Sequence, residues 1–193
     1  MQKGQKNSLN ENAAEAVTVS NKGWYCRGYL PHFDGGEVVQ FITFRLFDSV
    51  PENVIAQWKT ELNWQDNTAA DSTEAIELRE RIETYTDAGH GKCFLKDKRI
   101  AQLVEDALLC FDRQRYELFE WCIMPNHVHL LCRMYPDWSL DKIVHSWKSF
   151  TAHRANGILN RTGPFWMLDY FDRYIRDHYH FLKTVEYIRN NGK

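Results

Sequence analysis

The sequence has no long apolar run and no apolar segment at its N-terminus. A membrane-spanning helix needs about 20 mostly apolar residues, and a secretory signal peptide needs a shorter apolar stretch after a basic start. Their absence predicts a cytoplasmic protein without membrane contact. A strong net charge is also missing, since the formal value is −2. Any surface for nucleic acid must therefore be a local basic patch.

Cysteines at the short spacing of a zinc knuckle are missing as well. The five cysteines are Cys26, Cys93, Cys110, Cys122 and Cys132. Their odd number and apolar surroundings favour reduced, buried thiols in a cytosolic protein. Cys122 and Cys132 flank a pair of histidines, so a weaker alternative remains in which they join those histidines as metal ligands.

Internal repeats and low-complexity tracts are absent too, which argues against a repeat architecture. The hydrophobic content of 44% and the aromatic content of 14% are typical of a globular protein. A length of 193 residues suits one domain with a substantial core. Residues 1–22 are polar and lack aromatic side chains, and they predict a flexible tail. We expect a single domain over residues 23–193.

The apolar pattern predicts the secondary structure of this domain. Strands are expected at 38–47, 116–124, 127–134 and within 167–177, and helices at 51–64, 72–87, 97–114, 139–160 and 178–191. The two middle strands form a hairpin, and Ser72 or Thr73 caps the second helix. Without the helical insert at 51–89, the order is strand, helix, strand, strand, helix, strand. This order predicts an α+β fold with a ferredoxin-like antiparallel sheet and an extra C-terminal helix.

The stretch "CIMPNHVHLL", residues 122–131, places two histidines in an apolar strand. Side chains alternate along a strand, so His127 and His129 share one face, with Cα atoms roughly 7 Å apart. Neutral imidazole is the commonest metal ligand, and two rings on one face can converge on one ion. Two unrelated polar positions on an open face remain the alternative for this spacing alone.

"MPNHVHLL" is similar to the core motif of HUH single-strand DNA nucleases. A longer series of segments, in order over about residues 27–191, resembles the REP-associated tyrosine transposases, which are relatives of the single-tyrosine insertion-sequence transposases. The segments are "RGYLPHFD", "VQFITFRL", "YELFEWCIMPNHVHLL", "SLDKIVHSWKSFTAHRAN", "GPFWMLDYFDRYIRD" and "FLKTVEYIRNN". The resemblance implies a sheet of the HUH nuclease type and a catalytic tyrosine in a "YIxxN"-like helix.

Four tyrosines near the C-terminus compete for the role of nucleophile: Tyr170, Tyr174, Tyr179 and Tyr187. Tyr187 matches the family segment, and it stands four residues before Asn191, hence on the same face of a helix. The amide oxygen of Asn191 is expected to complete the metal site of His127 and His129. A half-buried tyrosine on an amphipathic helix is the alternative interpretation of Tyr187.

The resemblance implies nicking and rejoining of single-stranded DNA at hairpin-containing sites through a 5′-phosphotyrosine link, with Mg²⁺ or Mn²⁺ as the cofactor. Hairpin DNA is the expected partner, and a homodimer is considered. The expected DNA contacts are Lys148, Lys142, Arg154, Arg173, Arg176 and Arg27. Lys148 ranks first because "WKSFT" matches a family segment. Two alternatives stay open: a domesticated hairpin-binding regulator without cleavage activity, and a metal-dependent RNA-processing enzyme.

Overall fold

The computed structural model describes residues 23–26, 31–65, 68–69 and 72–191. The expected flexible tail at 1–22 and the expected DNA contact Arg27 lie outside these residues. The strands are β1 (Gly23–Cys26), β2 (Pro31–Asp34), β3 (Val39–Arg45), β4 (Tyr116–Ile123), β5 (His127–Met134) and β6 (Phe171–Tyr174). The helices are α1 (Glu52–Glu61), α2 (Thr73–Asp87), α3 (Lys98–Leu109), α4 (Leu140–Ile158) and α5 (His178–Asn191), with a short 3-10 helix at Phe94–Lys96.

Four strands form an antiparallel sheet in the order β4-β5-β3-β6. Numbered by their order along the chain, these strands lie as 2-3-1-4, which is the ferredoxin-like arrangement. The predicted hairpin of β4 and β5 is present, and the α+β fold is confirmed. β5 lies inside the sheet, and almost all of its residues are buried. This central position explains why its residues other than the two histidines and Arg133 are apolar.

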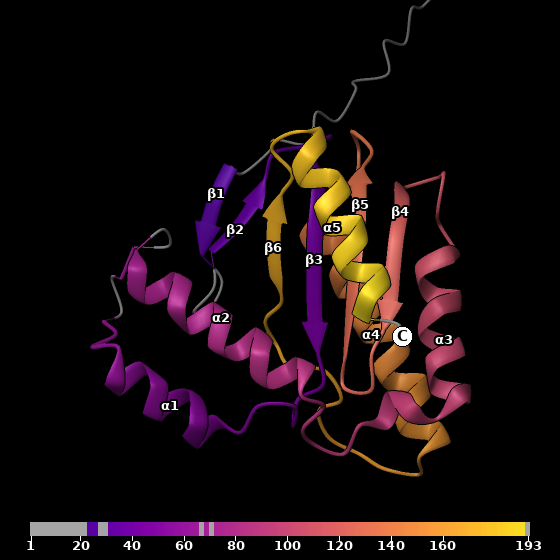
Figure 1. Cartoon of the computed structure of the whole chain (residues 1–193). Helices are drawn as coiled ribbons and strands as arrows, with labels where there is room; N and C mark the ends of the chain where they lie inside the picture. The colour runs from indigo at the N-terminus through magenta and orange to yellow at the C-terminus, as the bar shows by residue number, and fades with distance from the viewer. Residues whose placement is uncertain (1–22, 27–30, 66–67, 70–71, 192–193) are drawn as a thin grey trace, which may run out of the picture.

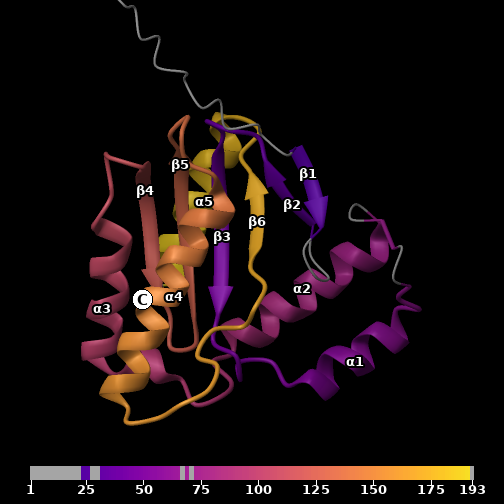
Figure 2. The same ribbon diagram turned by 180° about the vertical axis from the view of Figure 1, so that it is seen from behind.

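Helices cover both faces of the sheet (Figures 1 and 2). On one face, α3 and α4 pack over alternate residues such as Ile42, Val128 and Leu130, which form the larger core. On the other face, α5 packs over Phe41 and Leu131 through the buried Ile188. His127 and His129 alternate in the same sense as Leu131, so they lie on the α5 face. None of the described helices is long and apolar enough to cross a membrane.

Two features depart from or refine the sequence expectations. The segment before β3 is rich in aromatic and turn residues, and no strand is predicted there, whereas the structure contains the antiparallel pair of β1 and β2. The insert at 51–89 holds α1 and α2 as predicted, and Ser72 caps α2 by accepting a hydrogen bond from the amide of Ala75. α2 runs past the sheet so that its C-terminal end comes close to β3 (Figure 1).

A buried histidine connects the N-terminal hairpin with the edge strand β6. His32 is fully buried, and its Nδ1 lies 2.5 Å from Asp172 Oδ1 while its Nε2 lies 2.9 Å from Asp169 Oδ1. Burial lowers the pKa of His32, but the two carboxylates outweigh burial and raise it to about 9. The charged ring therefore stabilises the contact of β2 with β6.

The stability of the protein should fall between pH 6.5 and pH 9 because of His32. The pKa is raised in the folded state, so this stabilisation is fully present below the unfolded value of 6.5 and is lost as the pH rises through about 9. A difference of this size corresponds to about 3 kcal/mol of unfolding free energy. Urea unfolding at pH 6, 7.5 and 9.5 measures it. The variant His32→Gln should lose this pH dependence, and equal slopes for both proteins would contradict the assignment.

Candidate functional site

The two histidines of β5 are held at the centre of the sheet. His127 lies opposite Arg45 and His129 lies opposite Thr43 on β3, so backbone pairing with this strand sets their positions. Both imidazoles are fully buried, and their Nε2 atoms are 2.8 Å apart. The predicted convergence of the two rings on one face is therefore present.

Neighbouring side chains orient both rings. The Nδ2 of Asn126 donates to the carbonyl oxygens of Thr86 and His90, so its Oδ1 is left to accept from Nδ1 of His127 at 2.8 Å. His127 thus carries its proton on Nδ1 and presents the lone pair of Nε2. The hydroxyl of Thr43 lies 2.8 Å from Nδ1 of His129 and can accept in the same way. Such outer hydrogen bonds are typical of metal-binding histidines.

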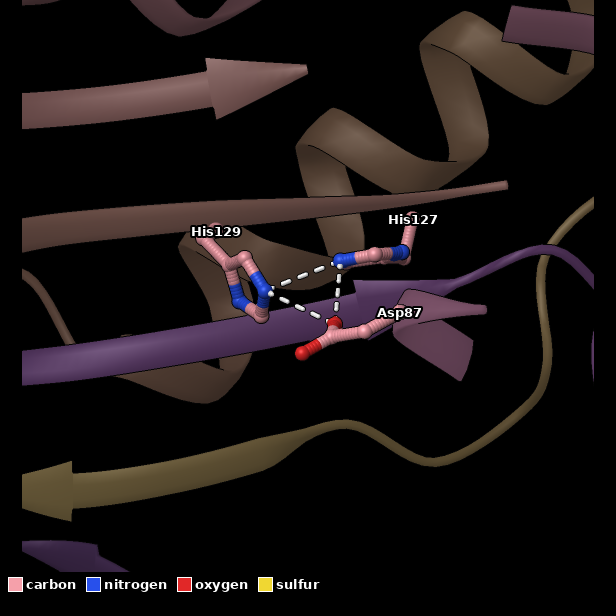
Figure 3. A group of neighbouring side chains, drawn as sticks. All are labelled: Asp87, His127 and His129. Carbon is pink, nitrogen blue, oxygen red and sulfur yellow. Dashed lines mark hydrogen bonds and ion pairs between the residues drawn. The ribbon is translucent and has the colours of Figure 1, made fainter. Parts of the chain in front are cut away.

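A carboxylate completes the cluster (Figure 3). Asp87, the last residue of α2, places Oδ1 3.2 Å from Nε2 of His127 and 3.6 Å from Nε2 of His129. Within the described part of the chain, these three residues form the group of histidine, cysteine and acidic side chains that could hold a metal ion.

The electrostatics of the cluster suit a bound cation. Burial raises the pKa of Asp87, but the two imidazoles outweigh burial and lower it, so the carboxylate is ionised. Burial lowers the pKa of His129 and favours the neutral ring, which is the form that binds metals. The pKa of Asp87 is lowered when the imidazole Nε2 atoms donate to it. A divalent cation bound to rings that carry their protons on Nδ1 would take the place of those donors.

The distances also fit one ion. Two ligand atoms that each lie about 2.1 Å from a metal, at right angles, are about 3.0 Å apart. The three separations in the cluster are 2.8, 3.2 and 3.6 Å. A set of two imidazole nitrogens and one carboxylate oxygen accepts Mg²⁺ or Mn²⁺, and the nitrogen ligands suit Mn²⁺ better. The donor set is therefore compatible with the predicted divalent metal.

Tyr187 of α5 lies beside this cluster. Its ring centroid is 5.3 Å from that of His129, and its hydroxyl donates to Glu83 Oε1 at 2.9 Å and to Asp87 Oδ2 at 3.2 Å. Burial and the two carboxylates raise the pKa of Tyr187, so the hydroxyl is protonated. Of the other candidates, Tyr170 is buried against His32, and Tyr179 is 70% exposed.

Asn191 lies one turn after Tyr187, as predicted, and it is close enough to the Tyr187 hydroxyl to lower the pKa of that group. Its Nδ2 is buried and has no hydrogen-bond partner. The two ends of an amide are interchangeable in shape, and the flipped amide would present its oxygen at this position instead. The role of Asn191 as a further oxygen ligand of the metal stays a prediction.

An open groove of about 530 Å³ between α2 and α5 leads to Tyr187. Arg173 and Lys183 lie on its basic side, and Glu80 and Glu83 lie on its acidic side. His180 also lines the groove, but burial and the nearby Arg173 and Arg176 lower its pKa and favour the neutral ring. The groove thus joins cationic groups that could hold phosphates to the hydroxyl and the metal-binding cluster.

The expected DNA contacts fall on both faces of the sheet. Arg173 lies in the groove beside Tyr187, and Arg176 is exposed just after β6. Lys142 and Arg154 are exposed on α4, which covers the opposite face (Figure 2). Lys148 is also on α4, where its ammonium donates to the carbonyl oxygens of Leu168 and Asp169 before β6. The structure thus brings Arg173 to the histidine site and separates the three residues of α4 from it.

The alternative cysteine ligands do not join the cluster. Cys132 alternates to the opposite face of β5 and is fully buried in the core under α3 and α4. Cys122 lies opposite His129 on β4, and its thiol contacts Met124 Sδ at 3.5 Å. Burial raises the pKa of both thiols, which favours the neutral form. The expectation of reduced, buried thiols is met by Cys93, Cys122 and Cys132, whereas Cys110 is exposed.

Three residues of the site were missed at the level of sequence: Glu83, Asp87 and Asn126. Glu83 and Asp87 stand among several other acidic residues of a charged helix, and nothing in their spacing separates them from the solvent-facing ones. Asn126 falls in the short break predicted between the two middle strands, where no role is expected for it. The signal that could have found it is its position next to the histidine pair, where an amide can orient the first ring.

A ferredoxin-like sheet that presents paired histidines to a tyrosine-bearing helix defines a domain of the HUH nuclease type. The family described as "Transposase IS200 like" matches residues 93–191, which is just over half of the chain. The protein therefore belongs to the IS200-like transposase family.

Two solved structures are similar to this chain. The first is described as a REP-associated tyrosine transposase bound to a REP hairpin, with a TM-score of 0.50 and 15% identity over 86% of this chain and 70% of that chain. At this identity the match concerns the fold. The second is a candidate transposase from Deinococcus radiodurans R1, with a TM-score of 0.33 and 16% identity over 86% of this chain and 96% of that chain. No curated protein matches the chain.

Proposed function

We propose that this transposase-family protein nicks and rejoins single-stranded DNA at hairpin-containing sites through a 5′-phosphotyrosine intermediate. The observation that carries the proposal is the position of the Tyr187 hydroxyl, which is 3.2 Å from the Asp87 carboxylate of the histidine cluster and lines an open groove. A nucleophile beside a metal-binding cluster is what phosphodiester transfer requires.

In this mechanism His127, His129 and Asp87 would hold one divalent ion, and the amide of Asn191 would be the further ligand. The bound ion supplies Lewis-acid polarisation of the scissile phosphate. Arg173 and Lys183 bind neighbouring phosphates along the groove. The oxygen of Tyr187 attacks phosphorus, and the 3′ oxygen leaves with its bonding electrons.

The phosphotyrosine link preserves the energy of the broken phosphodiester. A 3′-OH can later attack this link, restore the phosphodiester and release Tyr187. The exchange of one ester for another needs no nucleotide hydrolysis. Because the energy of the ester bond is retained in the phosphotyrosine link, we favour strand transfer over simple hydrolysis as the reaction of the site.

We expect cleavage of single-stranded DNA beside a hairpin and little cleavage of the same sequence as a perfect duplex. An unpaired strand can enter the groove and bring its backbone to Tyr187, whereas a paired strand is held away by its partner. The measurement uses end-labelled oligonucleotides with Mn²⁺ and a denaturing gel that separates protein–DNA adducts. Comparable rates on both forms would contradict the proposed substrate.

The same gel, combined with a binding assay, distinguishes the proposed cleaving enzyme from the alternative, a hairpin-binding regulator. Tight binding of the hairpin without an adduct at any Mg²⁺ or Mn²⁺ concentration would favour that alternative over cleavage.

A further inference from the structure

The proposed attack by Tyr187 requires a proton acceptor, because a phenol oxygen must lose its proton as it bonds to phosphorus. The hydroxyl donates to two carboxylates, Glu83 Oε1 at 2.9 Å and Asp87 Oδ2 at 3.2 Å. Both distances are within the reach of a general base. The next question is which carboxylate is available for the proton.

Asp87 is committed to the histidine cluster, where its Oδ1 faces Nε2 of both His127 and His129. The Nε2 atoms of the two rings face each other and Asp87, so they are candidate metal ligands as well and are not free to accept the proton. Glu83 lies one helical turn before Asp87 and stands outside the group of ligand atoms that converge. It lines the groove together with Tyr187. Glu83 is therefore the carboxylate that touches the hydroxyl without serving as a candidate ligand.

We propose that Glu83 is a catalytic residue that accepts the proton of Tyr187, an inference that rests on the proposed function. As the phenol oxygen forms its bond to phosphorus, the proton passes to the Glu83 carboxylate and the P–O3′ bond breaks. The departing 3′ oxygen keeps the bonding electrons and takes up a proton from solvent, and Glu83 releases the proton of Tyr187 to solvent through the open groove. The products are a 5′-phosphotyrosine, a free 3′-OH and the regenerated carboxylate.

This assignment gives the helical insert a chemical role. α2 carries both Asp87 and Glu83 on adjacent turns, and its last residue, Asp87, contacts the histidine pair of β5. One helix would thus deliver a metal ligand and a base in a set geometry. The site would be incomplete without the insert.

The test compares Glu83→Gln with the wild type in the rate of adduct formation on a hairpin oligonucleotide with Mn²⁺. Glutamine can still accept a hydrogen bond from Tyr187, so the ring stays in place, but it cannot take the proton. We expect the rate to fall by about 10²- to 10⁴-fold, with Mn²⁺ affinity and hairpin affinity within about twofold of the wild type. Glu74→Gln is the matched control, since Glu74 is an exposed glutamate of the same helix that does not line the groove. It should form the adduct at the wild-type rate.

A second measurement separates a base from a residue that only positions the ring. Incorporation of a fluorinated tyrosine at position 187 makes the phenol more acidic and reduces the need for a base. The ratio of the wild-type rate of adduct formation to that of Glu83→Gln should then decrease by about tenfold or more. An unchanged gap, or a wild-type rate for Glu83→Gln with ordinary tyrosine, would overturn the role of Glu83. Failure of the wild type itself to form any adduct would instead overturn the proposed function.

Discussion

Replacement of Tyr187 by phenylalanine should abolish the covalent protein–DNA adduct. The ring and its packing against Phe41 and His129 remain, and only the hydroxyl that would attack phosphorus is lost. Loss of a nucleophile typically lowers the rate by about 10⁴-fold or more. The free energy of unfolding should change by about 1 kcal/mol or less. A denaturing gel measures the adduct, and urea unfolding measures the stability.

The control for this prediction is Tyr179→Phe, which changes an exposed tyrosine on the same helix. It should leave adduct formation intact. Mass spectrometry of the adduct from the wild type identifies the modified residue directly. A nucleotide on Tyr170, Tyr174 or Tyr179 would refute the choice of Tyr187 while leaving the class of reaction in place.

Replacement of His129 by alanine should eliminate the binding of Mn²⁺ and the metal-dependent cleavage. The ring supplies one of three converging ligand atoms, and we expect an affinity loss of at least about 100-fold. Saturating Mn²⁺ at about 100 times the wild-type Kd should stabilise the wild type by about 2.7 kcal/mol and the variant by about 0.4 kcal/mol or less. Calorimetric titration and the shift of Tm with Mn²⁺ measure both effects.

His153→Ala is the matched control, because His153 is exposed on α4 at the opposite face of the sheet. This variant should bind Mn²⁺ with wild-type affinity. Cleavage by His129→Ala in the presence of a chelator, at the wild-type rate, would rule out the metal-dependent mechanism.

The strands that carry the site could be predicted from the sequence because their patterns involve only neighbouring residues. The apolar run of β5 and the alternation along it placed His127 and His129 on one face before any packing was known. The spacing of Tyr187 and Asn191 likewise placed both on one face of α5. The aromatic hairpin of β1 and β2 was missed, because its residues alternate less regularly and its turn signals suggested a loop.

What the sequence determined by itself is the order of strands and helices, the shared face of the histidines and the resemblance to a transposase family. Each of these depends on residues a few positions apart, for which the geometry of a helix or strand is enough. Only the tertiary structure decided that Asp87 and Glu83 face the histidine cluster and Tyr187, and that α4 carries its lysines on the far side of the sheet. These relations join residues roughly 40 to 100 positions apart, and they depend on how α2 crosses the sheet. The physical reason is that an acidic residue in a charged amphipathic helix has the same local pattern whether it faces water or a metal site.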